Sequence, residues 1–266
     1  MSERLLEVKN LSCSFEIERN FLRQNKNLQV LKDINFSLNK GVTLGIVGES
    51  GCGKSTLCRT ILSLNKKDKG NVIWFGKDIN DFTKNDFKTF RKRVQVIFQD
   101  PYGSLNPRMT IGNIISEPLE IYRKDIGKDI KTLKVLDVME KVGLSDLLYN
   151  RFPHELSGGQ CQRVGIARSI INEPDVLICD EPVSSLDLSV QSQILTLLKE
   201  LKINLNITMI FVSHDLAVVK SISDEVMVLN QGLIVENNTA DNVFRNPQNE
   251  YTRKLISSVP RINAIE

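Results

Sequence analysis

A glycine-rich segment, Gly48 to Ser55, stands between two stretches of contrasting pattern. The residues before it, Val42 to Val47, form a short apolar run that predicts a buried strand, and Ser55 to Leu64 has apolar residues at helical spacing. The segment fits the pattern Gly-x-x-x-x-Gly-Lys-Ser/Thr, in which glycines allow consecutive backbone N–H groups to surround a phosphate. An ordinary glycine turn is the alternative, but the position between a strand and a helix favours a phosphate loop.

Each part of such a loop has a task in binding the phosphates of ATP. The start of the following helix adds positive potential, the ammonium of Lys54 reaches the β and γ phosphates, and the hydroxyl of Ser55 is a magnesium ligand. We therefore predict that the chain binds ATP and Mg²⁺ here. The residues expected to contact the nucleotide in this loop are Gly48, Glu49, Ser50, Gly51, Cys52, Gly53, Lys54, Ser55 and Thr56.

A second apolar run ends in two carboxylates. Val176 to Cys179 predicts a buried strand, and Asp180 and Glu181 follow it directly. Beside a phosphate loop, Asp180 is expected to hold the magnesium shell and Glu181 to polarise the attacking water as general base. Alone the pattern is weak, because strands commonly end in acidic residues.

A serine followed by two glycines lies in Leu156 to Gln160, immediately before a stretch with helical spacing of apolar residues. Such a helix start binds anions through its backbone N–H groups. One nucleotide cannot use both this helix start and the phosphate loop of the same chain, so we predict that it binds a nucleotide held by a second chain. A plain helix cap is the alternative. The expected contacts are Ser157, Gly158, Gly159 and Gln160.

Hydrophobic periodicity outlines the rest of the fold. Leu5 to Phe15 and Leu31 to Leu38 alternate loosely and predict two strands of an antiparallel sheet, joined by a polar loop from Glu16 to Gln29. Val94 to Phe98 and Met209 to Val212 predict further buried strands. Because helical patterns separate the buried strands, the chain is expected to form a mostly parallel α/β sheet.

The middle of the chain is predicted to be a helical block. Tyr102 to Pro153 has no strand signal, and Lys131 to Val142 is its clearest amphipathic stretch. A later helix is indicated between the strands at Val176 and Met209 by apolar residues at helical spacing, namely Val190, Ile194, Leu197, Leu198 and Leu201.

Composition excludes several classes of protein. Of the 266 residues, 41% are hydrophobic and 25% are charged, which is typical of a globular protein. The 35 basic and 32 acidic residues are dispersed, so a run such as Arg91 to Arg93 indicates a solvated helix face rather than a nucleic-acid surface. No apolar stretch reaches the roughly 18 residues needed to cross a bilayer, and no signal-peptide pattern is present. We expect a cytoplasmic chain that does not span the membrane and does not bind nucleic acid.

Cysteine and histidine are sparse and scattered. The chain has two histidines, and its five cysteines form no Cys-x-x-Cys pair. We therefore expect neither a structural zinc site nor a disulfide, and mostly buried thiols. The cysteines are Cys13, Cys52, Cys58, Cys161 and Cys179.

These motifs occur in the order and spacing of one family. Together with Gln99, Asp187 and His214, they make nearly the whole chain resemble the nucleotide-binding subunits of ABC transporters. The resemblance implies that Gln99 contacts magnesium and water and faces the membrane subunits. It implies that Asp187 lies at the seam of a dimer and that His214 contacts the γ-phosphate. Phe15 occupies the position that stacks on adenine, with a core phenylalanine as the alternative; a structural role is the alternative for His214.

The resemblance also implies the architecture. The expected fold is α/β, a P-loop NTPase (RecA-like) core with a mostly parallel sheet, an antiparallel β subdomain and an inserted α-helical subdomain. The whole of 1–266 would form one nucleotide-binding domain. Within it, residues 1–100 and 160–235 would form the core and the antiparallel subdomain. The helical subdomain would take about 101–159 and would carry the signature motif, which is the segment from Leu156 to Gln160. Residues 236–266 would form a C-terminal tail.

Strings outside the shared motifs resemble the dipeptide, oligopeptide and nickel importer subfamily. They are Phe98 to Thr110, Ser116 to Leu119 and Asn246 to Pro260, and the polar loop near residue 20 also fits. Many peptide-importing members continue well past the segment that ends at Pro260, whereas this sequence stops at Glu266. The resemblance therefore does not distinguish nickel importers from compact peptide importers.

One residue departs from the family pattern. Cys161 stands where similar proteins usually carry arginine after the signature motif. Nucleotide binding is expected to survive, because Ser157 and two backbone amides supply the phosphate contacts.

The resemblance implies an ATP hydrolase that energises uptake of peptides or nickel, peripheral to the cytoplasmic face of a bacterial inner membrane. Its implied partners are a second cassette, two membrane permeases and, indirectly, a solute-binding protein. A heterodimer of related cassettes is favoured, with a homodimer in isolation. One alternative is a soluble ABC-type ATPase acting on the ribosome or DNA, against which stand the single cassette and the absence of sustained heptads. Another is a catalytically idle cassette, against which stand the intact Asp180, Glu181 and His214.

Overall fold

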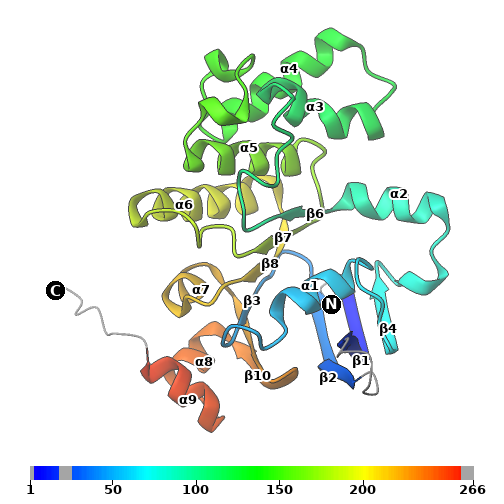
Figure 1. The fold of residues 1–266 in the computed structure, drawn as a ribbon, viewed down its shortest axis with the longest axis vertical. Coiled ribbons are helices and arrows are strands. Elements are labelled where there is room, and N and C mark those ends of the chain that lie inside the picture. Colours follow the sequence, from blue (N-terminus) through cyan, green and yellow to red (C-terminus); the bar gives the residue numbers. More distant parts are fainter. Residues whose placement is uncertain (1–2, 18–25, 259–266) are drawn as a thin grey trace. The chain divides into compact units, whose positions relative to one another are not determined.

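The computed structural model describes residues 3–17 and 26–258 of the chain. The chain divides into two compact units, Met1–Phe82 with Phe211–Glu266, and Thr83–Ile210. Figure 1 shows the helices and strands that each unit contains.

The first unit contains a four-stranded antiparallel sheet in the order β2-β1-β4-β5. Its strands are β1 (Arg4–Ile17), β2 (Lys26–Asn39), β4 (Lys69–Trp74) and β5 (Lys77–Asp78). Apolar residues of its strands, such as Leu6, Leu11 and Leu38, are buried in the core. The buried indole of Trp74 donates a hydrogen bond of 2.8 Å from Nε1 to the carbonyl of Ile61, which ties the sheet to helix α1 (Lys54–Ile61).

The predicted antiparallel pair near the N-terminus is confirmed, but the predicted loop from Glu16 to Gln29 includes residues that belong to the strands. β1 continues to Ile17 and β2 already begins at Lys26, and these two residues face each other in the ladder. Backbone pairing does not depend on side-chain polarity, so polar residues extend the strands. Residues 18–25 of the predicted loop lie outside the described residues.

The first unit also carries a parallel strand pair. β3 (Thr43–Val47), buried at all five positions, runs parallel to β9 (Glu225–Asn230), and β10 (Leu233–Thr239) pairs antiparallel with β9. Helix α7 (Leu216–Ile222) packs closely on β3, because a Cβ added at Gly45 would lie 2.5 Å from Val219 Cγ1. Besides α1, the helices of this unit are η1 (Ile79–Asp81), α7 (Leu216–Ile222), α8 (Ala240–Arg245) and α9 (Glu250–Ser257).

The second unit contains the parallel pair β6 (Val94–Ile97) and β7 (Val176–Asp180), with Val94 opposite Val176 and Ile97 opposite Cys179. β8 (Thr208–Val212) lies next to β7 and runs past the last residue of the unit. The strands predicted at these places are therefore confirmed, and β7 and β8 are buried as predicted. β6 is only partly buried and ends at Ile97, because Phe98 lies outside the strand and is exposed. The helices are α2 (Lys84–Arg93), α3 (Ile111–Tyr122), α4 (Lys128–Lys141), η2 (Asp146–Leu148), η3 (Pro153–Glu155), α5 (Gly158–Ile170) and α6 (Leu188–Leu205).

The helical block is also confirmed, since residues 102–153, all of which are described, contain helices and no strand. The amphipathic stretch predicted from Lys131 to Val142 lies in α4, which begins a turn earlier and buries Val135, Val138 and Met139 on one side. This spacing of three and four residues places the buried side chains on one face of the helix.

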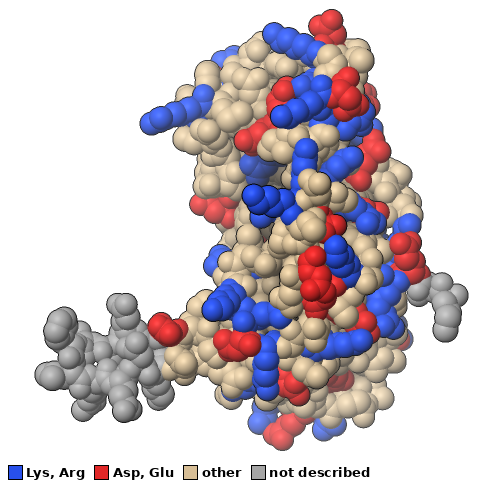
Figure 2. All heavy atoms as spheres, turned by 90° about the vertical axis from the view of Figure 1, so that its right-hand side faces the viewer, with Lys and Arg blue, Asp and Glu red and all other residues tan. Residues whose placement is uncertain are grey.

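Surface and interior agree with a globular chain. All five cysteines are buried. Among the described residues, none of the helices has the length and apolar character that a bilayer crossing requires. On the face drawn in Figure 2, Lys and Arg are interspersed with Asp and Glu, so neither sign of charge forms a continuous field there.

Candidate nucleotide-binding site

The glycine-rich loop joins β3 to α1, as the sequence predicts. Gly51 and Gly53 have φ angles of 80° and 111°, which side-chain-bearing residues rarely adopt. Gly48 is required for a second reason, because a Cβ at this position would lie 2.1 Å from the carbonyl oxygen of Leu229. The loop therefore follows a path that only glycine permits at these positions.

Lys54 turns its ammonium into this loop. Only 5% of the residue is exposed, and Nζ donates hydrogen bonds of 2.8 Å to the Gly48 carbonyl and 2.9 Å to the Glu49 carbonyl. Burial raises the pKa of the neighbouring Cys52 thiol, so this side chain stays neutral and brings no negative charge into the loop. The ammonium is thus held at the centre of the backbone turn.

The start of α1 is open to an anion. No side chain caps its first turn, and no acidic residue lies in that turn. The first N–H groups of a helix lack partners within the helix and carry partial positive charge. Together with the ammonium of Lys54, they suit a phosphate group.

The C-terminal helix supplies a contact that the sequence did not predict. The Glu49 N–H donates a hydrogen bond of 3.1 Å to the hydroxyl of Tyr251 in α9. Burial raises the pKa of Tyr251, so its hydroxyl remains protonated at neutral pH. The sequence could not have revealed this contact, because 202 positions separate the two residues.

Phe15 and His214 also belong to the first unit. Phe15 lies near the end of β1 and is 40% exposed, which argues against the alternative of a core phenylalanine. His214 is exposed in the turn between β8 and α7. The residue before it, Ser213, donates a backbone hydrogen bond of 3.3 Å to Ile46 in β3, so this turn begins beside the strand that leads into the phosphate loop.

Gln99 and Glu181 meet in the second unit. The parallel pairing of β6 with β7 places their carboxyl ends side by side, and the Gln99 Nε2 donates a hydrogen bond of 3.2 Å to Glu181 Oε2. Glu181 has a φ of 52°, an uncommon backbone conformation for a residue with a side chain. Such strain concentrates at functional positions. Asp180 precedes it as the last residue of β7.

The signature segment caps a helix. Ser157 is the N-cap of α5: its hydroxyl accepts from the Gln160 N–H at 3.3 Å, and the Gln160 side chain accepts from the Ser157 N–H at 2.9 Å. Gly159 packs against α6, because a Cβ there would lie 2.7 Å from Val190 Cγ1. The helix-cap alternative is therefore confirmed as local geometry. Contact with a second chain's nucleotide stays a prediction.

Asp187 caps the next helix. It accepts hydrogen bonds from the Val190 N–H at 3.0 Å and the Ser189 hydroxyl at 2.7 Å. These bonds lower the pKa of the Asp187 carboxyl, so it is ionised at neutral pH. Its position at a dimer seam remains a prediction.

The sequence and the fold were compared with known proteins. The ABC transporter family model matches residues 31–184, which is more than half of the chain. The chain belongs to the ABC transporter family. It is 49% identical over 261 residues to the oligopeptide transport ATP-binding protein OppF of Haemophilus influenzae, covering 97% of this chain and 79% of the relative. It is 42% identical to the dipeptide transport ATP-binding protein DppF of Escherichia coli, covering 99% of this chain and 78% of the relative.

The fold has matching solved structures. One is the dimeric ATP-binding cassette MJ0796 bound to ADP and phosphate, with a TM-score of 0.79 and 26% identity over 89% of this chain and 99% of that chain. The expected P-loop NTPase fold and the resemblance to peptide-importer cassettes are thereby confirmed. The alternative of a cassette acting on the ribosome or DNA finds no support in these relatives.

Cys161, the departure from the family pattern, points into this cassette's interior. It is fully buried, its thiol lies 3.5 Å from the Pro153 carbonyl, and burial raises its pKa to about 11. The residue therefore packs as a neutral side chain. It leaves the exposed edge of the signature segment to Ser157 and the glycines.

The donor groups of the cassette fit a magnesium nucleotide. The phosphate loop offers backbone N–H groups and an ammonium to phosphate oxygens. Ser55, Gln99 and Asp180 offer the hydroxyl, amide and carboxylate oxygens that Mg²⁺ accepts beside water and phosphate. Ser55 belongs to the first unit, and Gln99 and Asp180 belong to the second.

Proposed function

We propose that this cassette binds and hydrolyses ATP to drive the uptake of short peptides through membrane permeases. The observation that carries the proposal is the phosphate loop with Lys54 held inside it. Support for peptides as cargo comes from the 49% and 42% identical relatives, which are named for oligopeptide and dipeptide transport. Nickel, the other substrate of the resembling subfamily, becomes the competing outcome of the test.

The first unit would grip the nucleotide. Backbone N–H groups from Gly48 to Thr56 and the ammonium of Lys54 would surround the β and γ phosphates. Phe15, with 40% of its surface exposed, would offer its ring to adenine. Mg²⁺, when bound, would neutralise phosphate charge, and Ser55, Asp180 and Gln99 are the residues that would hold it.

A second cassette would complete the site. Ser157, Gly158, Gly159 and Gln160 at the start of α5 would contact the phosphates held by the other chain, with Asp187 at the seam between them. The dimeric MJ0796 cassette, which is 26% identical to this chain, supports this arrangement. We favour a related cassette as the partner in the complete transporter and a homodimer of this chain in isolation.

Hydrolysis would depend on placement and charge. Glu181 accepts a proton from the attacking water, Gln99 orients that water, and His214 donates a hydrogen bond to the γ-phosphate. In this structure the Gln99 amide holds Glu181 Oε2 at 3.2 Å, so the carboxylate already has a fixed orientation. Glu181 Oε1 is the remaining oxygen of this carboxylate.

The cassette would act at the cytoplasmic face of a bacterial inner membrane as a peripheral subunit. Two permeases would carry the cargo path, and the helical block after Gln99 would transmit closure and opening of the cassettes to them. A solute-binding protein would deliver the cargo and would contact this chain only indirectly. Cargo specificity would lie in those partners.

Transport by the assembled complex tests the proposal. Vesicles containing this chain, its partner cassette and the permeases should take up a labelled tripeptide when ATP and the solute-binding protein are supplied. The same vesicles with the Lys54→Ala variant should take up none. Uptake of a nickel complex in place of peptides would overturn the cargo assignment, and hydrolysis without transport of either would overturn the role in import.

A further inference from the structure

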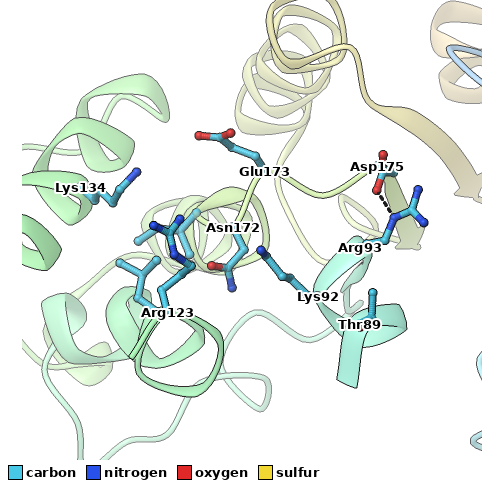
Figure 3. Close-up of a pocket in the computed structure, with 10 residues that line it drawn as sticks. Thr89, Lys92, Arg93, Arg123, Lys134, Asn172, Glu173 and Asp175 are labelled. Carbon is cyan, nitrogen blue, oxygen red and sulfur yellow. Dashed lines mark hydrogen bonds and ion pairs between the residues drawn. The ribbon is translucent and has the colours of Figure 1, made fainter. Parts of the chain in front are cut away.

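A cavity of about 360 Å³ lies at the amino ends of β6 and β7 in the second unit (Figure 3). Arg93 immediately precedes β6 and Asp175 immediately precedes β7, and both line it. Gln99 and Glu181 follow the carboxyl ends of these two strands. The cavity is therefore separate from the catalytic residues of this unit, and its volume lies within the roughly 300 to 1,000 Å³ typical of small-molecule sites.

The wall of this cavity carries four cations and two carboxylates. Two of the four cations have a partner. Arg93 Nε pairs with Oδ2 of Asp175, a carboxylate of the wall, at 2.6 Å, and Arg123 donates from Nε and Nη2 to Asp125, which is not among the residues that line the cavity. Lys92 and Lys134 are half-buried, and no ion pair is found for either within the described ranges 3–17 and 26–258. The remaining carboxylate, Glu173, is exposed. The unbalanced charge on this wall is positive.

A buried amide lies among these cations. The Nδ2 and Oδ1 atoms of Asn172 are both buried, and neither has a hydrogen-bond partner in the part of the chain that the structure describes. Figure 3 shows Lys92 of α2 and Arg123 at the end of α3 on either side of this side chain, with Lys134 of α4 further along the wall beyond Arg123. Buried polar atoms without partners are rare and costly, so this amide calls for a ligand.

The ligand must satisfy both ends of the amide as well as the two ammonium groups. A monoester or hydrogen phosphate meets these requirements at neutral pH. Its unprotonated oxygens accept from Lys92, Lys134 and the Asn172 amide nitrogen, and a P–OH or ester-borne hydroxyl donates to the Asn172 oxygen. A fully ionised sulfate would lack the donor, and the nearby Glu173 carboxylate disfavours a purely accepting anion.

We propose that this cavity binds a small phosphate-bearing metabolite. Lys92 and Lys134 would supply the charge, and Asn172 would supply the directional hydrogen bonds. Since these residues come from α2, α4 and the segment between α5 and β7, the ligand would fasten three elements of this unit to one another.

Calorimetric titration of the full-length chain with inorganic phosphate tests the proposal. The chain should carry Lys54→Ala, which removes phosphate binding by the glycine-rich loop, and ionic strength should be held constant. Adding Lys92→Ala and Lys134→Ala together should weaken phosphate binding by about tenfold or more, because two charge-assisted contacts are lost. The pair Lys88→Ala and Lys128→Ala is the matched control, since it removes the same charge from exposed positions on the same two helices.

The Asn172→Ala variant separates a binding role from a structural one. It should also weaken phosphate binding, while its melting temperature without phosphate should stay level or rise, because two unpartnered buried atoms are removed. Tighter binding of phosphate than of sulfate would further support the site. Unchanged affinity in the Lys92 and Lys134 variant, equal loss in the control, or no heat of phosphate binding at all would each overturn the proposal.

Discussion

Lys54 shows how a single side chain is prepared for its proposed ligand. The residue is only 5% exposed, and its ammonium is held by two carbonyls of the loop that it is proposed to complete. These partners are neutral carbonyls, so they do not cancel the positive charge of the ammonium. The acidic residue in the loop is Glu49, and its side chain is exposed. The loop therefore presents both an ammonium and the N-terminal turn of a helix to a phosphate.

Replacing Lys54 by Ala should weaken ATP binding by about a hundredfold or more, because a buried charge-assisted contact with the phosphates is lost. Equilibrium binding of a fluorescent ATP analogue measures the effect. Lys69→Ala, at an exposed position in β4 of the same unit, is the control and should keep normal affinity. Unchanged affinity in the Lys54 variant would show that the loop is not the phosphate site.

Tyr251 makes a residue-scale prediction about the same loop. Tyr251→Phe removes the acceptor of the Glu49 N–H, a hydrogen bond with a net value of about 1 kcal/mol. The Glu49 amide should exchange with deuterium several times faster, and ATP should bind a few-fold more weakly, while the melting temperature changes little. Tyr149→Phe in the second unit is the control. Wild-type exchange at Glu49 in Tyr251→Phe would mean that the hydroxyl does not hold the loop.

At the scale of elements, the start of α5 has two roles to reconcile. The hydroxyl of Ser157 caps its own helix at 3.3 Å from the Gln160 N–H, and the same residue is proposed to face another chain's phosphate. A capping side chain can do both only if its oxygen or the adjoining N–H groups remain accessible. The hydrogen bond between the Ser157 hydroxyl and the Gln160 N–H is exposed, so the hydroxyl oxygen remains accessible.

Two substitutions at Ser157 separate these roles. Ser157→Asp keeps a good N-cap and should leave the free energy of unfolding within about 0.5 kcal/mol, but its negative charge should repel the phosphate and lower ATP turnover by about tenfold or more. Ser157→Ala should cost about 1 kcal/mol of stability through the lost cap. Urea unfolding and steady-state ATPase assays measure both. Full turnover by the aspartate variant would show that this helix start never meets a triphosphate.

The elements predictable from sequence are those with continuous apolar runs beside a motif, such as β3 before the phosphate loop and β7 before Asp180. β9 carries the same signal, because Val226 to Leu229 is an apolar run that is buried, and the same rule could have found it. β4 escaped prediction because exposed and polar residues interrupt its alternation and its partner β1 lies far back in the sequence. β10 pairs with the neighbouring strand β9, but it escaped prediction because none of its residues is fully buried and its second half is polar. Local pattern carries no information about such distant partners.

The same division holds for the candidate site. Glycines and Lys54 were predictable because a phosphate loop needs them at a fixed spacing. The hydrogen bond between Gln99 and Glu181 depends on two strands pairing in register across 82 positions, and the burial of Cys161 depends on how α5 packs. Those features follow from tertiary structure, so the sequence could indicate the residues but not their contacts.

At the scale of the whole molecule, the proposed machinery is shared between the two units. The phosphate loop, Phe15 and His214 belong to the first, whereas Gln99, Glu181 and the start of α5 belong to the second. The account requires that a second chain supplies the closing surface.

The Glu181→Gln variant provides the most direct test of that requirement. Without the general base it should bind ATP and fail to hydrolyse it, so light scattering with excess Mg-ATP should show a stable dimer that is absent with ADP. The measurement should be made on the chain alone and mixed with its partner cassette, and the same variant carrying Ser157→Asp should stay monomeric. If each chain bound one ATP and stayed monomeric in both samples, the result would contradict the account.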